Sequence, residues 1–274
     1  MFEEVANKLK DAWLERMERA SQLQVRWKET RTHMQGALRP AHLIERMVGT
    51  IAPEVLANGI PHEDTEFKDL RQSLRISDSK MRFETQALSI VDPMNLRYED
   101  VLACNNGKYS RSTIARFDGS AVNGIINHEN RNMYARSMVL SAIMTSYRAF
   151  NEDFVVSIDP VIESVEGDGT CVVKLGKERV WVDSKRNYFP LRHARYLEGQ
   201  LFERVDIHVA KSDGCWDLTG WKYVKFDRYQ NCERAAEIYA TKVEHMGFEA
   251  SNPSDFELIF EAGTQVSKRR DSAR

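Results

Sequence analysis

The stretch from Val182 to Asp227 constrains the fold of this chain more than any other. It is a run of segments rich in β-branched and aromatic residues, VDSKRNYFPLRHARYLEGQLFERVDIHVAKSDGCWDLTGWKYVKFD. Short turn sequences divide it at 183–187, 198–200 and 212–214. Extended segments joined by turns this short pair with their neighbours as antiparallel hairpins. The sequence therefore predicts a meander, and a sheet of this kind must have one of its faces covered.

Further strands are expected on the N-terminal side of this meander. At Leu23 the period of the apolar residues changes from 3.6 to 2, and LQVRWKETRTH is typical of a half-buried strand. Strands are also expected at 72–86, 98–104, 109–117 and 121–127, and almost continuously from 154 onward. Aspartates that precede glycine at Asp118, Asp168 and Asp213 indicate turns between strands.

Three stretches are expected to be helical. Residues 3–20 have an amphipathic pattern with a period of 3.6, and 41–57 and 135–149 are expected to form two shorter helices. The polar segment 59–69 is typical of a loop. Residues 232–250 are ambiguous, because their composition favours a helix while a period of two would suit a strand.

These elements predict an α+β fold that is mostly β. We expect one large antiparallel sheet, with the N-terminal helix and short helices packed on its concave face. A chain of 274 residues with 42% hydrophobic content can bury a substantial core. Without an internal repeat or a low-complexity linker, one domain is expected at 1–266, followed by a disordered basic tail at 267–274.

Charge and targeting signals exclude some classes of partner. The chain has 39 Lys and Arg against 41 Asp and Glu, so its balanced charge predicts no attraction to nucleic acid. No segment has the roughly 20 apolar residues of a membrane span, and the N-terminal residues do not resemble a signal peptide. Either a cytoplasmic protein or a mature exported form is therefore expected.

Residue types that carry chemistry do not form a recognisable motif. The GxSxG, HExxH, Walker and GxGxxG patterns are absent, and seven histidines are scattered. His193 and His208 fall on strands expected to be neighbours, but not opposite each other. The cysteines Cys104, Cys171, Cys215 and Cys232 form no CxxC pair. We expect no catalytic residue, metal or cofactor. We interpret the cysteines as free thiols, and the alternative is that they form disulfides in an oxidising compartment.

Apolar side chains of one parity along the strands suggest a binding surface. The residues expected to line it are Val25, Trp27, Met81, Phe83, Val205, Ile207, Trp216 and Leu218. A wide sheet with only three helical stretches to cover it can leave an apolar groove, and such grooves bind lipids or other hydrophobic chains. The alternative is that the helices fill this face completely and give a dry core.

The order of the parts resembles that of a known family. The parts are a leading helix ending near Trp13, then VRWKETRTH, MRFET, the turn FDGS, YFPLRHARY, SDGCWDLTGWKYVKFD and the closing FELIFEAGTQV. Together they span nearly the whole chain. In this order they resemble the LolA/LolB-like superfamily of outer-membrane lipoprotein-sorting proteins, periplasmic lipoprotein carriers, of which this chain would be a divergent member.

The resemblance implies a wide incomplete barrel with helices as a lid, and it implies that 232–250 is a strand. Family members hold lipid or the acyl chains of lipoproteins, without a cofactor or a reaction. The expected ligand is therefore a lipid or a lipoprotein acyl chain, and the expected partner is a membrane-associated protein. The expected location is the periplasm or cell envelope. This chain lacks a signal peptide and a lipobox cysteine and has a long insertion at about 34–70, and no ligand-binding residue of the family maps onto it.

Three hypotheses for function follow. The first is a non-enzymatic lipid or lipoprotein carrier with an apolar cavity, and the second is a protein-interaction or structural module whose concave face is filled. The third is a hydrolase that uses two carboxylates about 5–10 Å apart in a cleft. Whether the concave face is open or filled separates the first two hypotheses.

Overall fold

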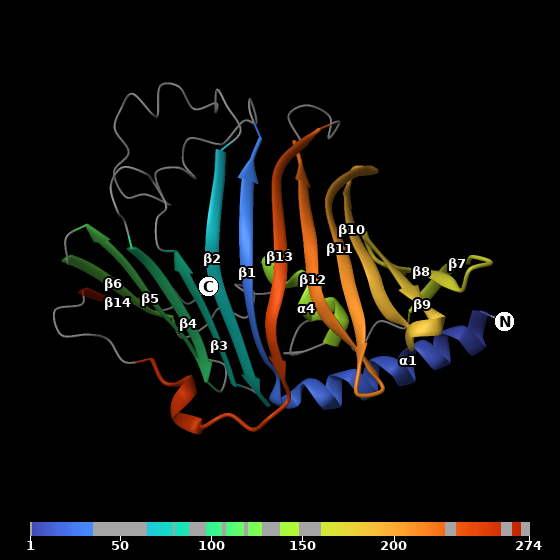
Figure 1. The fold of residues 1–274 in the computed structure, drawn as a ribbon, viewed down its shortest axis with the longest axis horizontal. Coiled ribbons are helices and arrows are strands. Elements are labelled where there is room, and N and C mark those ends of the chain that lie inside the picture. Colours follow the sequence, from blue (N-terminus) through green and yellow to red (C-terminus); the bar gives the residue numbers. More distant parts are fainter. Residues whose placement is uncertain are drawn as a thin grey trace.

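The fold is mostly β, as the sequence predicts. A computed structural model describes residues 2–34, 65–78, 80–87, 97–105, 108–117, 120–127, 138–147, 160–227, 234–258 and 265–269. Its strands belong to one sheet of fourteen. An N-terminal helix and a short second helix accompany the sheet (Figure 1).

The helices lie at the start and in the middle of the chain. They are α1 (Phe2–Arg19) and α4 (Met138–Tyr147), with the short 3-10 helices η1 (Ala20–Gln22), η2 (Ser184–Arg186) and η4 (Pro253–Phe256). Both α-helices fall where the apolar period predicts them. α1 has acidic residues in its first turn and basic residues in its last, which favours a helix through its macrodipole.

The first eight strands lie on either side of α4 in the sequence, six before it and two after it. They are β1 (Gln24–His33), β2 (Thr65–Ser77), β3 (Lys80–Ala87), β4 (Arg97–Asn105), β5 (Lys108–Phe117), β6 (Ser120–Asn127), β7 (Val161–Val165) and β8 (Thr170–Leu175). The remaining six are β9 (Glu178–Asp183), β10 (Phe189–Leu197), β11 (Gln200–Ser212), β12 (Cys215–Phe226), β13 (Ala235–Gly247) and β14 (Gln265–Arg269).

The strands are arranged in the order β14-β6-β5-β4-β3-β2-β1-β13-β12-β11-β10-β9-β8-β7. Neighbours pair in antiparallel fashion except for β14, which lies parallel to β6. The expected antiparallel sheet is therefore confirmed, with one parallel pair at this edge. The sheet is not closed, because β14 and β7 stand at opposite ends of the order.

The predicted meander is confirmed as strands β9 to β12. Its hairpin turns place Glu198 and Asp213 at positive φ, and the glycine that follows each of them does the same. Such angles suit Asp and Gly, which explains the turn signals at these places. His193 lies opposite Val205, so the expected offset from His208 is also correct.

Residues 232–250 contain a strand and not a helix. β13 lies between β1 and β12 and pairs with both. The two flanking strands satisfy its backbone groups, and this pairing outweighs the helix propensity of its Glu, Ala and Lys residues.

Two boundaries differ from the prediction. The expected loop at 59–69 is wrong for its last residues, because β2 begins at Thr65 opposite His33 of β1. The expected disordered tail is wrong at 267–269, which complete β14. The predicted helix at 41–57 and the turn at Asp118 lie outside the described residues.

The core lies between the sheet and the two helices. We call the face of the sheet that packs on α4 the inner face; α1 crosses one end of the strands (Figure 1). A second apolar cluster joins α1 to β8 and β9 and includes the free thiol Cys171, whereas the free thiol Cys215 is exposed. The side chain of Cys104, and Cys232, lie outside the described part. No helix in that part is long and apolar enough to cross a membrane.

Candidate functional site

The eight positions predicted to line a groove come together in the structure. They lie on β1, β3, β11 and β12 and belong to, or pack against, a single apolar cluster on the inner face. Six of them are at most 4% exposed, and Phe83 and Trp216 are partly buried. Side chains buried to this degree face neither solvent nor an open groove. In this conformation the positions form a packed core.

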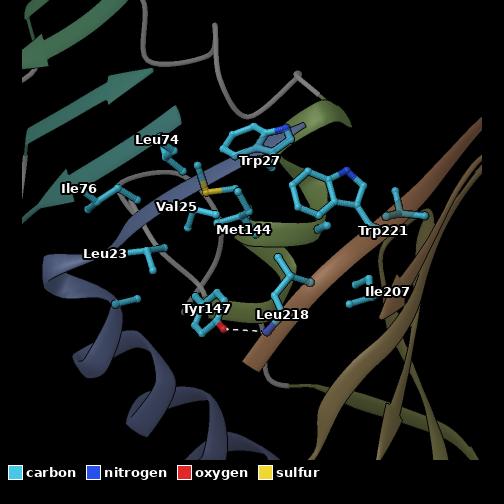
Figure 2. Packing of buried hydrophobic residues seen from close by; sticks show 14 of the residues in the cluster. Leu23, Val25, Trp27, Leu74, Ile76, Met144, Tyr147, Ile207, Leu218 and Trp221 are labelled. Atoms are coloured by element: carbon cyan, nitrogen blue, oxygen red, sulfur yellow. Dashed lines mark hydrogen bonds between the residues drawn. The ribbon is translucent and has the colours of Figure 1, made fainter. Parts of the chain in front are cut away.

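Helix α4 fills this part of the inner face. Each residue from Ser141 to Tyr147 is buried. Because successive residues of an α-helix point about 100° apart, seven buried in a row mean that the helix is enclosed on every side. Met144 and Tyr147 lie among the side chains of β1, β2 and β12 (Figure 2). α4 therefore occupies the place that a ligand would take in an open half-barrel.

A buried histidine holds one side of α4. His193 Nδ1 lies 3.0 Å from the Ser141 hydroxyl and 3.2 Å from the Thr145 hydroxyl. Its Nε2 lies 2.9 Å from a carboxylate oxygen of Glu178. With Nε2–H donating to Glu178, Nδ1 accepts from the two hydroxyls. The order serine, histidine, acid is that of a nucleophilic triad, but both hydroxyls share one nitrogen and are buried, so the group anchors the helix.

The last residue of α4 carries a second anchor. The Tyr147 hydroxyl donates to Asp217 Oδ1 at 3.1 Å. It also accepts a hydrogen bond from the backbone N–H of Leu218 at 3.2 Å (Figure 2). Burial and the Asp217 carboxylate raise the pKa of Tyr147, so the hydroxyl stays protonated. The Asp217 carboxylate in turn accepts hydrogen bonds from Nη1 and Nη2 of Arg19, at 2.9 and 3.1 Å. α4 is thereby linked to α1 through the sheet.

A buried arginine of α1 forms the third anchor. Arg16 is 5% exposed and donates to the backbone carbonyls of Ser146, Asn187 and Tyr188 at 2.9, 2.6 and 3.0 Å. Burial lowers the pKa of Arg16 to about 10. The carbonyl of Ser146 belongs to the negative end of the α4 dipole, which favours a cation there. The three anchors hold one side of α4 and its C-terminal end.

A row of alternating charges crosses the inner face beyond α4. We call the row, which runs from β9 to β13, the charge ladder; its members are Glu178, Arg195, Glu203, Lys225 and Glu237. Each lies directly opposite the next on the adjacent strand. Arg195 binds Glu178 and Glu203, both at 3.0 Å, and Lys225 binds Glu237 at 3.2 Å. Opposite charges at such cross-strand positions favour one register.

Two carboxylates of the ladder differ in their proton affinity. Burial alone would raise the pKa of Glu178, but the hydrogen bonds that it accepts from His193 and Arg195, together with the charge of Arg195, hold it below its ordinary value. Burial raises the pKa of Glu203, which Arg195 opposes only in part. A hydrolase of the two-carboxylate type holds its substrate between the two carboxylates. Here Arg195 lies between them and binds both, so the pair forms a structural ion-pair network.

Sequence reasoning missed two large inward side chains of β12. Trp216 and Leu218 point inward as predicted, but Trp221 and Tyr223, of the opposite parity, are also buried there. The register shifts opposite His208 and Val209, so one residue of β12 is left unpaired and the parity changes. Gly220 is the sequence signal for such a bulge. A Cβ at this glycine would lie 2.4 Å from the Thr241 carbonyl oxygen.

Comparisons with known proteins concern the fold. A DUF1329 family protein from Desulfovibrio piger is similar in structure, with a TM-score of 0.43 and 11% sequence identity over 92% of this chain and 97% of that chain. No protein-family model matches the sequence, and no curated protein matches it. None of these findings supports the LolA/LolB-like carriers specifically, so that finer resemblance stays a prediction.

Proposed function

We propose that this protein is a non-enzymatic carrier of a lipid or lipoprotein acyl chain, and that the chain takes the place of α4 on the inner face. One observation supports the proposal above the others. Eight apolar positions on four strands converge on one cluster, and the cover over that cluster is a ten-residue helix held by a few polar contacts. A carrier needs an apolar surface that can be covered without cargo and uncovered with it.

The energetics suit an exchange of one cover for another. Burial of hydrocarbon contributes about 0.8 kcal/mol for each CH₂ group, so a long acyl chain can replace the apolar contacts of the helix. α4 is about 15 Å long at 1.5 Å per residue. The cost of the exchange lies in the anchors, because His193, Asp217 and Arg16 lose partners when α4 leaves. Affinity for cargo should therefore rise when an anchor is weakened.

The variant Tyr147→Phe tests this relation. It keeps the ring in the cluster and removes the hydroxyl that binds Asp217 and Leu218. A lost hydrogen bond of this kind destabilises the seated helix by about 1 kcal/mol, so a fluorescent fatty acid should bind about fivefold more tightly. Equilibrium fluorescence titration measures the change in dissociation constant.

A matched control is Tyr188→Phe, which removes a hydroxyl from the second apolar cluster and keeps the Tyr188 carbonyl that accepts from Arg16. This control should bind the probe as the wild type does. Equal binding by wild type and Tyr147→Phe would contradict the exchange. If Trp27→Asp lost probe binding while its circular dichroism spectrum showed a retained fold, the result would support binding of the acyl chain on the predicted surface.

The filled inner face favours a second candidate function. If α4 never leaves, the sheet is the closed scaffold of a protein-interaction or structural module, and the burial of the predicted lining favours this view. Native mass spectrometry with organic extraction of the purified protein separates the two candidates. Co-purifying lipid supports the carrier. Absence of lipid, together with no probe binding by either tyrosine variant, supports the module.

The carrier proposal also includes a place and a partner. An acyl-chain carrier exchanges its cargo with a membrane-associated protein, which in the proposed role lies at the periplasm or cell envelope. Cell fractionation with an antibody to this protein tests the location. A cytoplasmic location would contradict the envelope role without touching the binding chemistry of the inner face.

A further inference from the structure

Polar groups without partners lie in the middle of the inner face. Five side chains, each at most 9% exposed, have buried polar atoms that no hydrogen bond satisfies within the described part of the chain. We call them the polar cluster: Trp27 Nε1, Glu29 Oε2, both amide atoms of Gln72, Trp221 Nε1 and Thr241 Oγ1. Buried polar atoms are nearly always satisfied in native proteins, so a group of exceptions needs a cause.

The sheet register places these residues side by side. Gln72 lies directly opposite Trp27, and Thr241 lies directly opposite both Glu29 and Trp221 on its two flanking strands. The rings of Trp27 and Trp221 are 5.4 Å apart between centroids. The cluster therefore forms one patch across β2, β1, β13 and β12. Its donors and acceptors lie next to one another, beside the apolar cluster on which a ligand would lie.

Neither α4 nor a plain hydrocarbon can satisfy this patch. Trp27 and Trp221 belong to the same packed cluster as Ile143 and Met144 of α4, whose side chains offer no strong hydrogen-bonding group. Desolvated polar atoms without partners destabilise the state that buries them. Relief comes from an occupant that carries its own donors and acceptors at this depth.

The charges of the patch define the headgroup of that occupant. Glu29 is paired with Arg31 through its other carboxylate oxygen, so the pair is neutral as a whole. The unpaired oxygen Oε2 would repel an anion, and the indole donors of Trp27 and Trp221 carry no formal charge. Hydroxyl groups donate and accept at once and match a patch that mixes both roles.

We infer that the ligand is an uncharged amphiphile whose headgroup carries hydroxyls, seated on the polar cluster with its chain in the place of α4. This inference rests on the proposed function and names the class of cargo. A site built to bond a hydroxyl rejects analogues without one, because its buried groups then stay unpaired. A fatty-acid anion and a fatty-acid methyl ester, which has no hydroxyl, should both bind less well than a monoglyceride.

Three probes of equal chain length test the headgroup. Monopalmitoylglycerol carries two hydroxyls, methyl palmitate carries none, and palmitate is an anion; each competes with a fluorescent probe for the wild-type protein. Monopalmitoylglycerol should bind roughly tenfold more tightly than either of the others. In the double variant Gln72→Leu/Thr241→Val the preference should fall to about twofold or less, with binding of methyl palmitate retained.

The matched control is Thr30→Val on β1. It removes a threonine hydroxyl, as Thr241→Val does, but from a half-buried side chain on the other face of the sheet. This control should keep the tenfold preference. Thr241→Val alone carries the test if the double variant fails to fold, because it removes an unsatisfied hydroxyl at constant shape.

The outcomes separate the inference from the proposal beneath it. Equal binding of the three probes by the wild type, or a preference unchanged in Gln72→Leu/Thr241→Val, would overturn the headgroup assignment and leave the carrier standing. Failure of every probe to bind would remove the carrier and the headgroup assignment together.

Discussion

Two ends of the same inner face follow opposite chemistry. Under α4 the inward positions of β1 and β12 are apolar, as at Val25 and Leu218, and pack to near-complete burial. Toward the other end the inward positions become the charge ladder, in which Glu203 is buried and the other side chains are half-buried. Arg195 pairs there with Glu178 and Glu203, and Lys225 pairs with Glu237. The same period of two directs both sets of side chains inward. Alternation therefore fixes where a side chain points, while its neighbours decide whether a charge is tolerated there.

The two ends also stabilise the fold in different ways. The apolar end gains free energy by removing hydrocarbon from water, at about 25 cal/mol per Å². The ladder end gains little from each partly exposed ion pair, but a shift by one residue would turn every member to the wrong face. We interpret the apolar end as the source of stability and the ladder as a device that fixes the register of β9 to β13.

The largest expected effect is at the apolar end. Trp221→Ala removes a fully buried ring that touches Trp27, and the free energy of unfolding should fall by about 3–5 kcal/mol. The outward-facing and partly exposed Trp181 is the control, and its replacement by Ala should have less than half that effect. Urea denaturation measures both. Equal losses would mean that the inner face does not dominate stability.

A smaller loss is expected at the charge ladder. Arg195→Met leaves Glu178 and Glu203 without their shared partner, and the free energy of unfolding should fall by about 1–3 kcal/mol. The double variant Arg195→Met/Glu203→Leu should recover part of this loss, because an unpaired buried carboxylate is removed.

The control for the ladder is Arg192→Met on the same strand, whose side chain is exposed and paired with Asp206. Its loss should be at most about 0.5 kcal/mol. If Arg192→Met and Arg195→Met were equal in denaturant, the ladder would be an ordinary set of surface ion pairs.

Much of the fold could be predicted because its signals are local. Turn residues at Glu198-Gly199 and Asp213-Gly214 set two hairpins, and the switch of period at Leu23 marks the passage from α1 to β1. The identity of β13 could not come from its own residues, since its two neighbours in the sheet decide it. The parallel pairing of β14 with β6 is likewise a contact between distant segments that no local pattern encodes.

The candidate site was predictable only in its apolar part. The alternation located the eight lining positions on one face. A charged residue in a strand, such as the buried Glu29, is expected to face solvent as long as its neighbours in the sheet are unknown. The anchors Arg16 and His193 act through partners more than forty residues away in the sequence. Their roles depend on tertiary packing, and no spacing along the chain reports it.

The smallest expected effect is the pH dependence of stability, which distinguishes the individual carboxylates of the ladder. Glu178 has a lowered pKa, so its contribution to stability is present above the ordinary value of 4.5 and is lost as the pH falls through the lower folded value. Glu203 has a raised pKa, so its contribution is present below 4.5 and is lost as the pH rises through the higher folded value. The two neighbours of Arg195 therefore act with opposite sign. Glu178→Gln should lower the stability most near neutral pH. Glu203→Gln should have its highest stability relative to the wild type at that pH.

Melting temperatures between about pH 3.5 and pH 7 measure both differences as a function of pH. The exposed Glu166→Gln in the turn between β7 and β8 changes the net charge equally and is the control. If Glu178→Gln and Glu203→Gln drifted in the same direction with pH, the opposite environments assigned to these carboxylates would be wrong. The ladder would then be a uniform row of ion pairs. Opposite drifts, with a flat control, would locate the difference at Arg195, where burial outweighs pairing on one side and pairing outweighs burial on the other.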